Sequence, residues 1–224
     1  MIKAVLFDLD NTLIDFMKMK RKCITAAIDA MIRNGLEMEP EAAEKVLYAI
    51  YEKEGIEYNR IFQAFLKEAQ QKIDYKMLSA GIVAYRKKQQ SLIEVYPNVI
   101  PTLIKLKTAG LKLAIVSDAP RLNAWIRLHE LNIADFFDTV VAFGDVEERK
   151  PSKLPFEKAL SVLKIPAEDV LMVGDWPDRD IKGANALGMK TCFAKYGYVL
   201  EEEPAHIADF EIDNISELVD IVSR

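Results

Sequence analysis

Short apolar segments that alternate with helical patterns constrain the fold of this chain more than any other feature. Apolar runs typical of buried strands predict strands over 4–7, 111–116, 139–143, 170–173, 190–194 and 210–212. Helical patterns separate most of these runs, at 99–109, 122–131, 154–163, 180–187 and 216–222. Strands that alternate with helices of about ten residues form βαβ units and a parallel sheet. The pattern therefore predicts an α/β fold.

The stretch from Asp15 to Tyr96 is different in kind. Its apolar residues recur at helical spacing in four segments, and no strand is expected there. Four helices of this length form a bundle. We therefore predict one α/β domain, residues 1–14 with 97–224, and a helical domain, residues 15–96, inserted after the first strand. This insertion favours a lid over the carboxyl ends of the strands, where open α/β sheets bind ligands.

Composition excludes several classes of protein. Of the 224 residues, 50% are hydrophobic and 29% are charged, which excludes intrinsic disorder as the main description. The net charge of −5 provides no global attraction for nucleic acid or anionic lipid, and no apolar run approaches a membrane helix. Cys23 and Cys192 match neither a disulfide framework nor a zinc site, which indicates a reducing compartment. We expect a cytoplasmic protein without nucleic-acid or membrane partners, either a monomer or a homodimer.

Polar side chains suited to a phosphate and a divalent cation follow three of the predicted strands. They are Asp8 and Asp10, Ser117 and Asp118, and Asp175, with Lys150 in a loop after another strand. Each has an ordinary interpretation when taken alone, such as an Asx turn, a helix N-cap or a solvated surface charge. Their recurrence at strand ends favours a common site at one edge of the sheet.

In these motifs the chain resembles the haloacid dehalogenase-like hydrolase superfamily. Asp8-Leu9-Asp10-Asn11-Thr12 matches its DxDxT motif, and Ser117 matches the hydroxyl residue of the second motif. Lys150-Pro151 is similar to the third motif, and Gly174-Asp175 followed by Asp180 is similar to the fourth. The helical insertion resembles the C1 cap of the subfamily that includes small-molecule phosphatases, haloacid dehalogenases and β-phosphoglucomutase. The resemblance implies a Rossmann-like three-layer sandwich with an inserted four-helix C1 cap.

The resemblance also implies a two-step phosphoryl transfer. Asp8 is implied to attack phosphorus and form an aspartyl-phosphate, while Asp10 serves as general acid and then general base. Mg²⁺ is assigned to the carboxylates of Asp8 and Asp175 and to the backbone carbonyl of Asp10.

Three further residues complete the implied site. Lys150 and the Ser117 hydroxyl bind the phosphoryl oxygens, helped by a backbone amide near Asp118, a position where Asn is frequent in the family. Asp180 orients Lys150 or a metal-bound water. The partner expected from these roles is a small-molecule phosphate ester.

The reaction is better defined by the sequence than the substrate is. Asp10 favours phosphate over haloacid chemistry, since hydrolytic dehalogenases need no second acid. The segments Met1–Asp10 and Met172–Asp175 resemble archaeal phosphatases associated with glyceraldehyde 3-phosphate. Phosphoglycolate-type phosphatase and β-phosphoglucomutase-like mutase activities stay open, as does a non-catalytic binding protein of this fold. Candidates for substrate selection in the insertion are Phe16, Lys18, Lys20, Arg21, Asn59 and Arg60.

Overall fold

The computed structural model describes residues 1–200 and 203–223. The chain divides into two compact units, Met1–Phe16 with Glu94–Arg224, and Met17–Ile93. The boundaries predicted from the sequence lie within a few residues of these, and the role of each unit as a functional domain stays a prediction. Among the described residues, no helix combines the length and the hydropathy needed to cross a bilayer.

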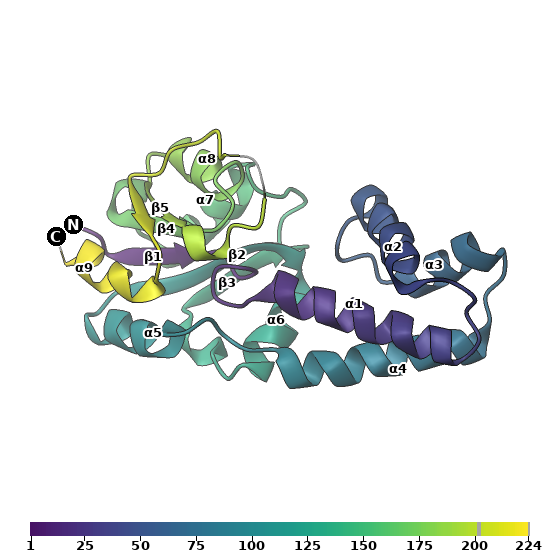
Figure 1. The fold of residues 1–224 in the computed structure, drawn as a ribbon. Helices are drawn as coiled ribbons and strands as arrows, with labels where there is room; N and C mark the ends of the chain where they lie inside the picture. Colours follow the sequence, from purple (N-terminus) through teal and green to yellow (C-terminus); the bar gives the residue numbers. More distant parts are fainter. Residues whose placement is uncertain (201–202, 224) are drawn as a thin grey trace. The chain divides into compact units, whose positions relative to one another are not determined.

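The first unit is built on a parallel sheet with the strand order β3-β2-β1-β4-β5-β6 (Figure 1). The strands are β1 (Ala4–Phe7), β2 (Lys112–Pro120), β3 (Thr139–Phe143), β4 (Val170–Gly174), β5 (Lys190–Ala194) and β6 (Phe210–Ile212). Every pairing between these strands is parallel. The predicted α/β class is confirmed. The second strand is longer than predicted and continues past Ser117 through a register shift between Ser117 and Pro120.

The first strand lies in the middle of the sheet because all four of its side chains are apolar. Ala4 to Phe7 are each 0% exposed, as expected for a strand covered on both faces. Ala4 is opposite Lys112 of β2 on one side and Val170 of β4 on the other. The chain adds β2 and β3 on one side of β1 and then returns to add β4 on the other. Such a switch leaves a crevice at the carboxyl ends of the strands.

Helices cover both faces of this sheet (Figure 1). On one face lie α7 (Leu154–Leu163) and α8 (Asp180–Asn185), and on the other lie α5 (Val99–Thr108), α6 (Arg121–Glu130) and α9 (Leu218–Val222). The core beneath α7 and α8 contains Phe156, Ala159 and Ala184 packed with Leu6, Val116 and Met172. Short 3-10 helices are η1 (Ala134–Phe136), η2 (Ala167–Asp169), η3 (Lys195–Gly197) and η4 (Ile215–Glu217). The three-layer arrangement expected of the sheet domain is therefore present.

The second unit is helical. Its helices are α1 (Phe16–Arg33), which begins in the first unit, α2 (Pro40–Glu54), α3 (Ile61–Gln70) and α4 (Tyr75–Leu92). They enclose a core of their own, in which Ile28, Leu47 and Phe65 are almost fully buried. Lys20, one of the candidates for substrate selection, is 7% exposed, and its ammonium lies 4.8 Å from the centroid of the Tyr51 ring.

Candidate functional site

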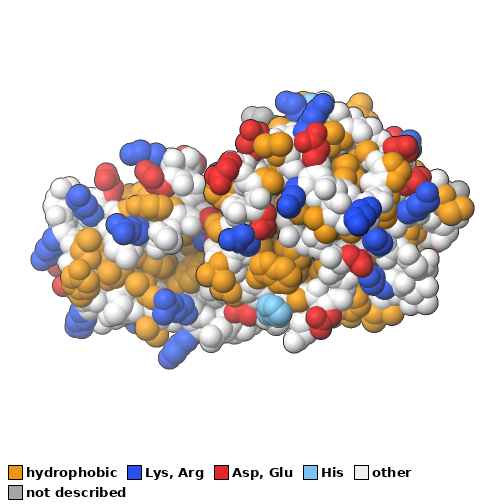
Figure 2. Space-filling view, turned by 180° about the vertical axis from the view of Figure 1, so that it is seen from behind, with side chains coloured by type: hydrophobic (Ala, Val, Ile, Leu, Met, Phe, Trp, Pro, Cys, Tyr) orange, Lys and Arg blue, Asp and Glu red, His pale blue; other side chains and the backbone are white. Residues whose placement is uncertain are grey.

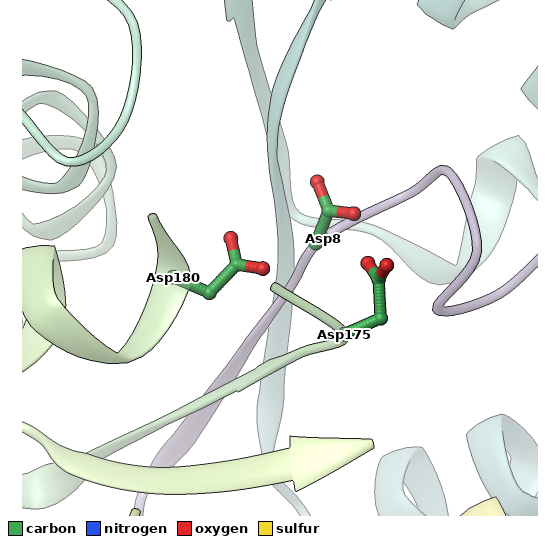
Figure 3. A group of neighbouring side chains, drawn as sticks. All are labelled: Asp8, Asp175 and Asp180. Carbon is green, nitrogen blue, oxygen red and sulfur yellow. The ribbon is translucent and has the colours of Figure 1, made fainter. Parts of the chain in front are cut away.

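Three aspartates meet at the carboxyl edge of the sheet. Asp8 follows β1 and Asp175 follows the adjacent β4, and the backbone N–H of Asp8 donates to the carbonyl of Val173 at 2.9 Å. Asp180 is the first residue of α8. One carboxylate oxygen from each lies within 4.8 Å of the others, and the three side chains point toward one another in Figure 3. Their exposed fractions are 7%, 4% and 1%, so the sheet brings three acids together away from solvent.

The glycine between the strand and these acids is required by a close approach. A Cβ atom at Gly174 would lie 2.3 Å from Cγ of Asp180, which is closer than two non-bonded carbon atoms can approach. The backbone N–H of Trp176 donates to Oδ2 of Asp180 at 3.0 Å and closes the connection between β4 and α8. The Gly174-Asp175 pair noted in the sequence thus lets Asp180 fold back toward the strand end.

Lys150 is the cation of this cluster. Its Nζ atom lies 2.5 Å from Oδ1 of Asp8 and 2.7 Å from Oδ1 of Asp180, and the residue is 5% exposed. Burial lowers the pKa of Lys150, but the charges of Asp180 and Asp8 outweigh burial and hold the pKa above its usual value. The ammonium group therefore stays protonated beside the carboxylate of Asp8.

One ammonium group cannot balance three buried carboxylates. Burial raises the pKa of Asp180 to about 7, with a further contribution from Asp8 and an opposing one from Lys150. Burial, followed by the charge of Asp8, also raises the pKa of Asp175 well above its usual value. Closely spaced carboxylate oxygens with excess negative charge match the donor chemistry that Mg²⁺ requires. The residues present therefore fit a divalent cation.

We predict that the metal-free protein loses stability as the pH rises from about 4 to about 7. Over this range Asp180 is already ionised in the unfolded chain but still binds a proton in the folded protein, because its folded pKa is raised to about 7. The folded state binds more protons, so the free energy of unfolding falls with increasing pH. Urea unfolding in a chelating buffer at several pH values measures this slope.

The Asp180→Asn variant is the matched control for this prediction. It removes one of the two acids with a raised pKa, Asp175 being the other, and should make the slope between these pH values shallower. A slope of the variant equal to that of the unaltered protein would contradict the assignment to Asp180.

Thr12 has a role in the site that sequence reasoning did not assign. Its hydroxyl donates to Oδ1 of Asp175 at 3.1 Å and accepts from the backbone N–H of Asp175 at 3.0 Å. Thr12 is 0% exposed and so ties the loop after β1 to the end of β4. The signal was present in the sequence, because Thr12 is the threonine of the DxDxT motif.

A second contact to this loop comes from η3. The Tyr196 hydroxyl donates to the carbonyl of Thr12 at 2.8 Å. A Cβ atom at Gly197 would lie 1.7 Å from the carbonyl oxygen of Asn11, so only glycine permits this approach. Sequence patterns did not indicate either residue, since both contacts join segments more than 180 residues apart.

Ser117 and Asp118 lie on β2 but differ in how they are held. The Ser117 hydroxyl accepts from the backbone N–H of Ala119 at 3.1 Å, which leaves the hydroxyl hydrogen as a donor. The Asp118 carboxylate accepts from the backbone N–H of Lys150 at 2.9 Å and from Nη1 of Arg179 at 3.3 Å. Asp118 therefore holds the Lys150 loop in place, and its predicted role in substrate binding stays a prediction about its backbone amide.

Asp10 takes part in a different ion pair. Its Oδ2 atom lies 2.7 Å from Nη1 of Arg127 on α6. The structure thus groups Asp8, Lys150, Asp175 and Asp180 in one cluster and couples Asp10 to a residue that sequence reasoning missed. Arg127 gave no signal in the sequence, since an arginine on an amphipathic helix is typical of a solvated face.

Charge on the surface is distributed differently from charge in this cluster. On the face shown in Figure 2, acidic and basic side chains lie interspersed among apolar ones. The buried cluster instead concentrates three acids around one lysine. The charge in this buried cluster therefore differs from the mixed charge of the surface.

Comparison with known proteins finds relatives along the whole length of the chain. A family model described as haloacid dehalogenase-like hydrolase matches residues 5–194, which include all the predicted motifs. Glyceraldehyde 3-phosphate phosphatase of Methanocaldococcus jannaschii is 35% identical over 100% of this chain and 98% of its own length. The protein of the same name from Methanopyrus kandleri is 36% identical over 99% and 97%. The crystal structure of an HAD phosphatase from Thermococcus onnurineus superimposes with a TM-score of 0.76, at 27% identity over 99% and 98% of the two chains.

Proposed function

Because the chain belongs to the haloacid dehalogenase-like hydrolase family, we propose that it hydrolyses a small phosphate monoester through an aspartyl-phosphate on Asp8. One observation carries the proposal. Asp8 is buried at the carboxyl end of the central strand with the Lys150 ammonium 2.5 Å away, and this pairing supports the proposal of a carboxylate nucleophile beside a cation for the phosphate. The full-length similarity to phosphatases supports this enzyme class over a haloacid dehalogenase.

The proposed reaction has two steps. An oxygen of Asp8 attacks phosphorus and the bond to the ester oxygen breaks, while Asp10 gives a proton to the departing alcohol. Asp10 then takes a proton from water as the water attacks phosphorus, and the bond between Asp8 and phosphorus breaks to release inorganic phosphate. Lys150 and the hydrogen of the Ser117 hydroxyl would contact phosphoryl oxygens and stabilise the charge that develops on them.

Mg²⁺ is the metal that we propose for this site. Asp8 and Asp175, together with the backbone carbonyl of Asp10, would hold it, and Asp180 would remain beside Lys150. When bound, the ion supplies charge that offsets repulsion between the Asp8 carboxylate and the phosphate. The excess of buried carboxylates over ammonium groups supports this assignment.

Removal of the metal provides the test of this function. We expect the protein to release phosphate from para-nitrophenyl phosphate in Mg²⁺, and excess EDTA to lower the rate at least about a hundredfold, because the metal offsets several kcal/mol of repulsion. Added Mg²⁺ should restore the rate, and circular dichroism should show that the fold survives chelation. Full activity in EDTA would exclude the proposed metal, and binding without phosphate release would indicate a non-catalytic protein.

Glyceraldehyde 3-phosphate is the first substrate that we propose. The relatives of that name cover nearly the whole chain. A panel containing glyceraldehyde 3-phosphate, phosphoglycolate and β-glucose 1-phosphate separates this choice from the phosphoglycolate and mutase alternatives. Formation of glucose 6-phosphate would identify a mutase. We also propose that the helical unit selects the substrate as a cap and that the enzyme is cytoplasmic.

A further inference from the structure

Helix α6 buries an arginine on the face that packs toward the sheet. Its residues Ala124, Arg127 and Leu128 are buried, while Leu122 on the opposite side is 71% exposed. Arg127 itself is only 4% exposed. A guanidinium group stays charged at all physiological pH values and carries five donors, so its burial is costly unless an anion faces it.

The anion that faces Arg127 is the second aspartate of the site. Nη1 of Arg127 lies 2.7 Å from Oδ2 of Asp10, and the two side chains are 5% and 20% exposed. The guanidinium carbon also lies 4.3 Å from the centroid of the Phe16 ring. An aromatic face beneath a guanidinium group restricts its plane, and a planar fork then restricts the carboxylate that it contacts. The Phe16 ring thus restricts the Arg127 guanidinium, and the guanidinium in turn restricts the Asp10 carboxylate.

We propose that Arg127 is the positioning residue for Asp10, fixing the carboxylate that transfers the proton to the leaving group. This inference rests on the proposed phosphatase function. A carboxylate on a loop loses effectiveness when its side chain samples several rotamers, and a fixed partner removes that freedom. Arginine suits the role because its own proton is not transferable in this pH range, so it orients the acid without replacing it.

The role predicts a dependence on the leaving group. A departing phenolate is more basic than a departing para-nitrophenolate, so the hydrolysis of phenyl phosphate depends more on proton donation. We expect Arg127→Gln to reduce kcat/KM for phenyl phosphate by a factor at least about tenfold larger than for para-nitrophenyl phosphate, which is part of the roughly 10²–10⁴-fold that a general acid contributes. Both substrates present the same phosphate to Asp8 and Lys150, so a general loss of structure would reduce both values equally.

Two further variants isolate the effect. Arg121→Gln on the same helix removes a more exposed ion pair, that of Arg121 with Asp145, and should change both values by less than about twofold. Adding Arg127→Gln to Asp10→Asn should lower kcat/KM almost no further, because the residue that Arg127 positions can no longer transfer a proton. Arg127→Lys keeps the charge but not the fork and should restore part of the phenyl phosphate rate.

The outcomes are distinguishable. If the unaltered protein releases phosphate from neither ester, the proposed function fails. If it is active but Arg127→Gln lowers both values by the same factor, or its effect adds fully to that of Asp10→Asn, the positioning role is overturned. If Arg127→Gln does not fold, Arg127→Lys replaces it in these assays. An equal loss of kcat/KM for both esters in Arg127→Lys then also overturns the positioning role.

Discussion

Asp8→Asn is expected to lower phosphate release by at least about ten thousandfold, since it removes the proposed nucleophile, on which both proposed steps depend. The amide has nearly the same shape as the carboxylate, so the backbone contact from Asp8 to Val173 should persist. Its oxygen can still accept a hydrogen bond from Lys150. The loss is therefore expected from missing chemistry and not from a changed fold.

Two measurements check this result. Steady-state assays with para-nitrophenyl phosphate measure the rate, and acid quenching during turnover of a labelled ester should trap protein-bound phosphate in the unaltered protein but not in the variant. Asp135→Asn is the matched control, because Asp135 is exposed and lies outside the cluster. Labelled protein in Asp8→Asn, or a rate within tenfold of the unaltered one, would indicate another nucleophile.

Lys150→Met is expected to reduce both activity and stability. It removes the ammonium group that lies 2.5 Å from Asp8 and 2.7 Å from Asp180, and so leaves buried carboxylates without their cation. Breaking a buried ion pair in this way costs about 3–5 kcal/mol of unfolding free energy. Loss of the proposed donor to the phosphoryl group should lower kcat at least about a hundredfold.

The stability effect of Lys150→Met should depend on pH. The pKa of Asp180 is raised to about 7, so its carboxylate is ionised in the folded protein only above that pH. The cost of losing Lys150 is therefore expected to be largest above pH 7 and to shrink as the pH falls toward 4, because Asp180 then binds a proton and no longer needs a cation beside it.

Urea unfolding of Lys150→Met at pH 8 and pH 5 in EDTA measures the loss of stability and its dependence on pH. Lys153→Met is the control, since Lys153 is exposed three residues away in the same loop region. A larger stability loss at pH 5 than at pH 8 would reverse the expected sign and contradict the buried cluster.

Much of the fold followed from local patterns. The apolar run from Ala4 to Phe7 predicts a buried strand without any knowledge of its neighbours, because a strand covered on both faces needs apolar side chains throughout. The alternation with helices then predicted the parallel sheet. The lengths of the strands were less well predicted. Strand β2 extends to Pro120 through a register shift that no local pattern indicates.

The site was predictable to the extent that it follows strand ends. Asp8 and Asp175 come together because neighbouring parallel strands end at one edge of the sheet. The contacts of the Asp118 carboxylate and of Arg127 were not predictable in this way. The Asp118 carboxylate contacts Lys150 and Arg179, which are 32 and 61 residues away, and Arg127 contacts Asp10 across 117 residues.

The sequence by itself determined the family and the α/β class and named the residues proposed to carry the chemistry, since periodicity and strand-end motifs are properties of short segments. Only the tertiary structure decided which charges face one another. It placed one lysine between two buried acids and coupled the second aspartate of the DxDxT motif to Arg127. The physical reason is that an ion pair depends on distance in space and on removal from water, and neither is set by separation along the chain.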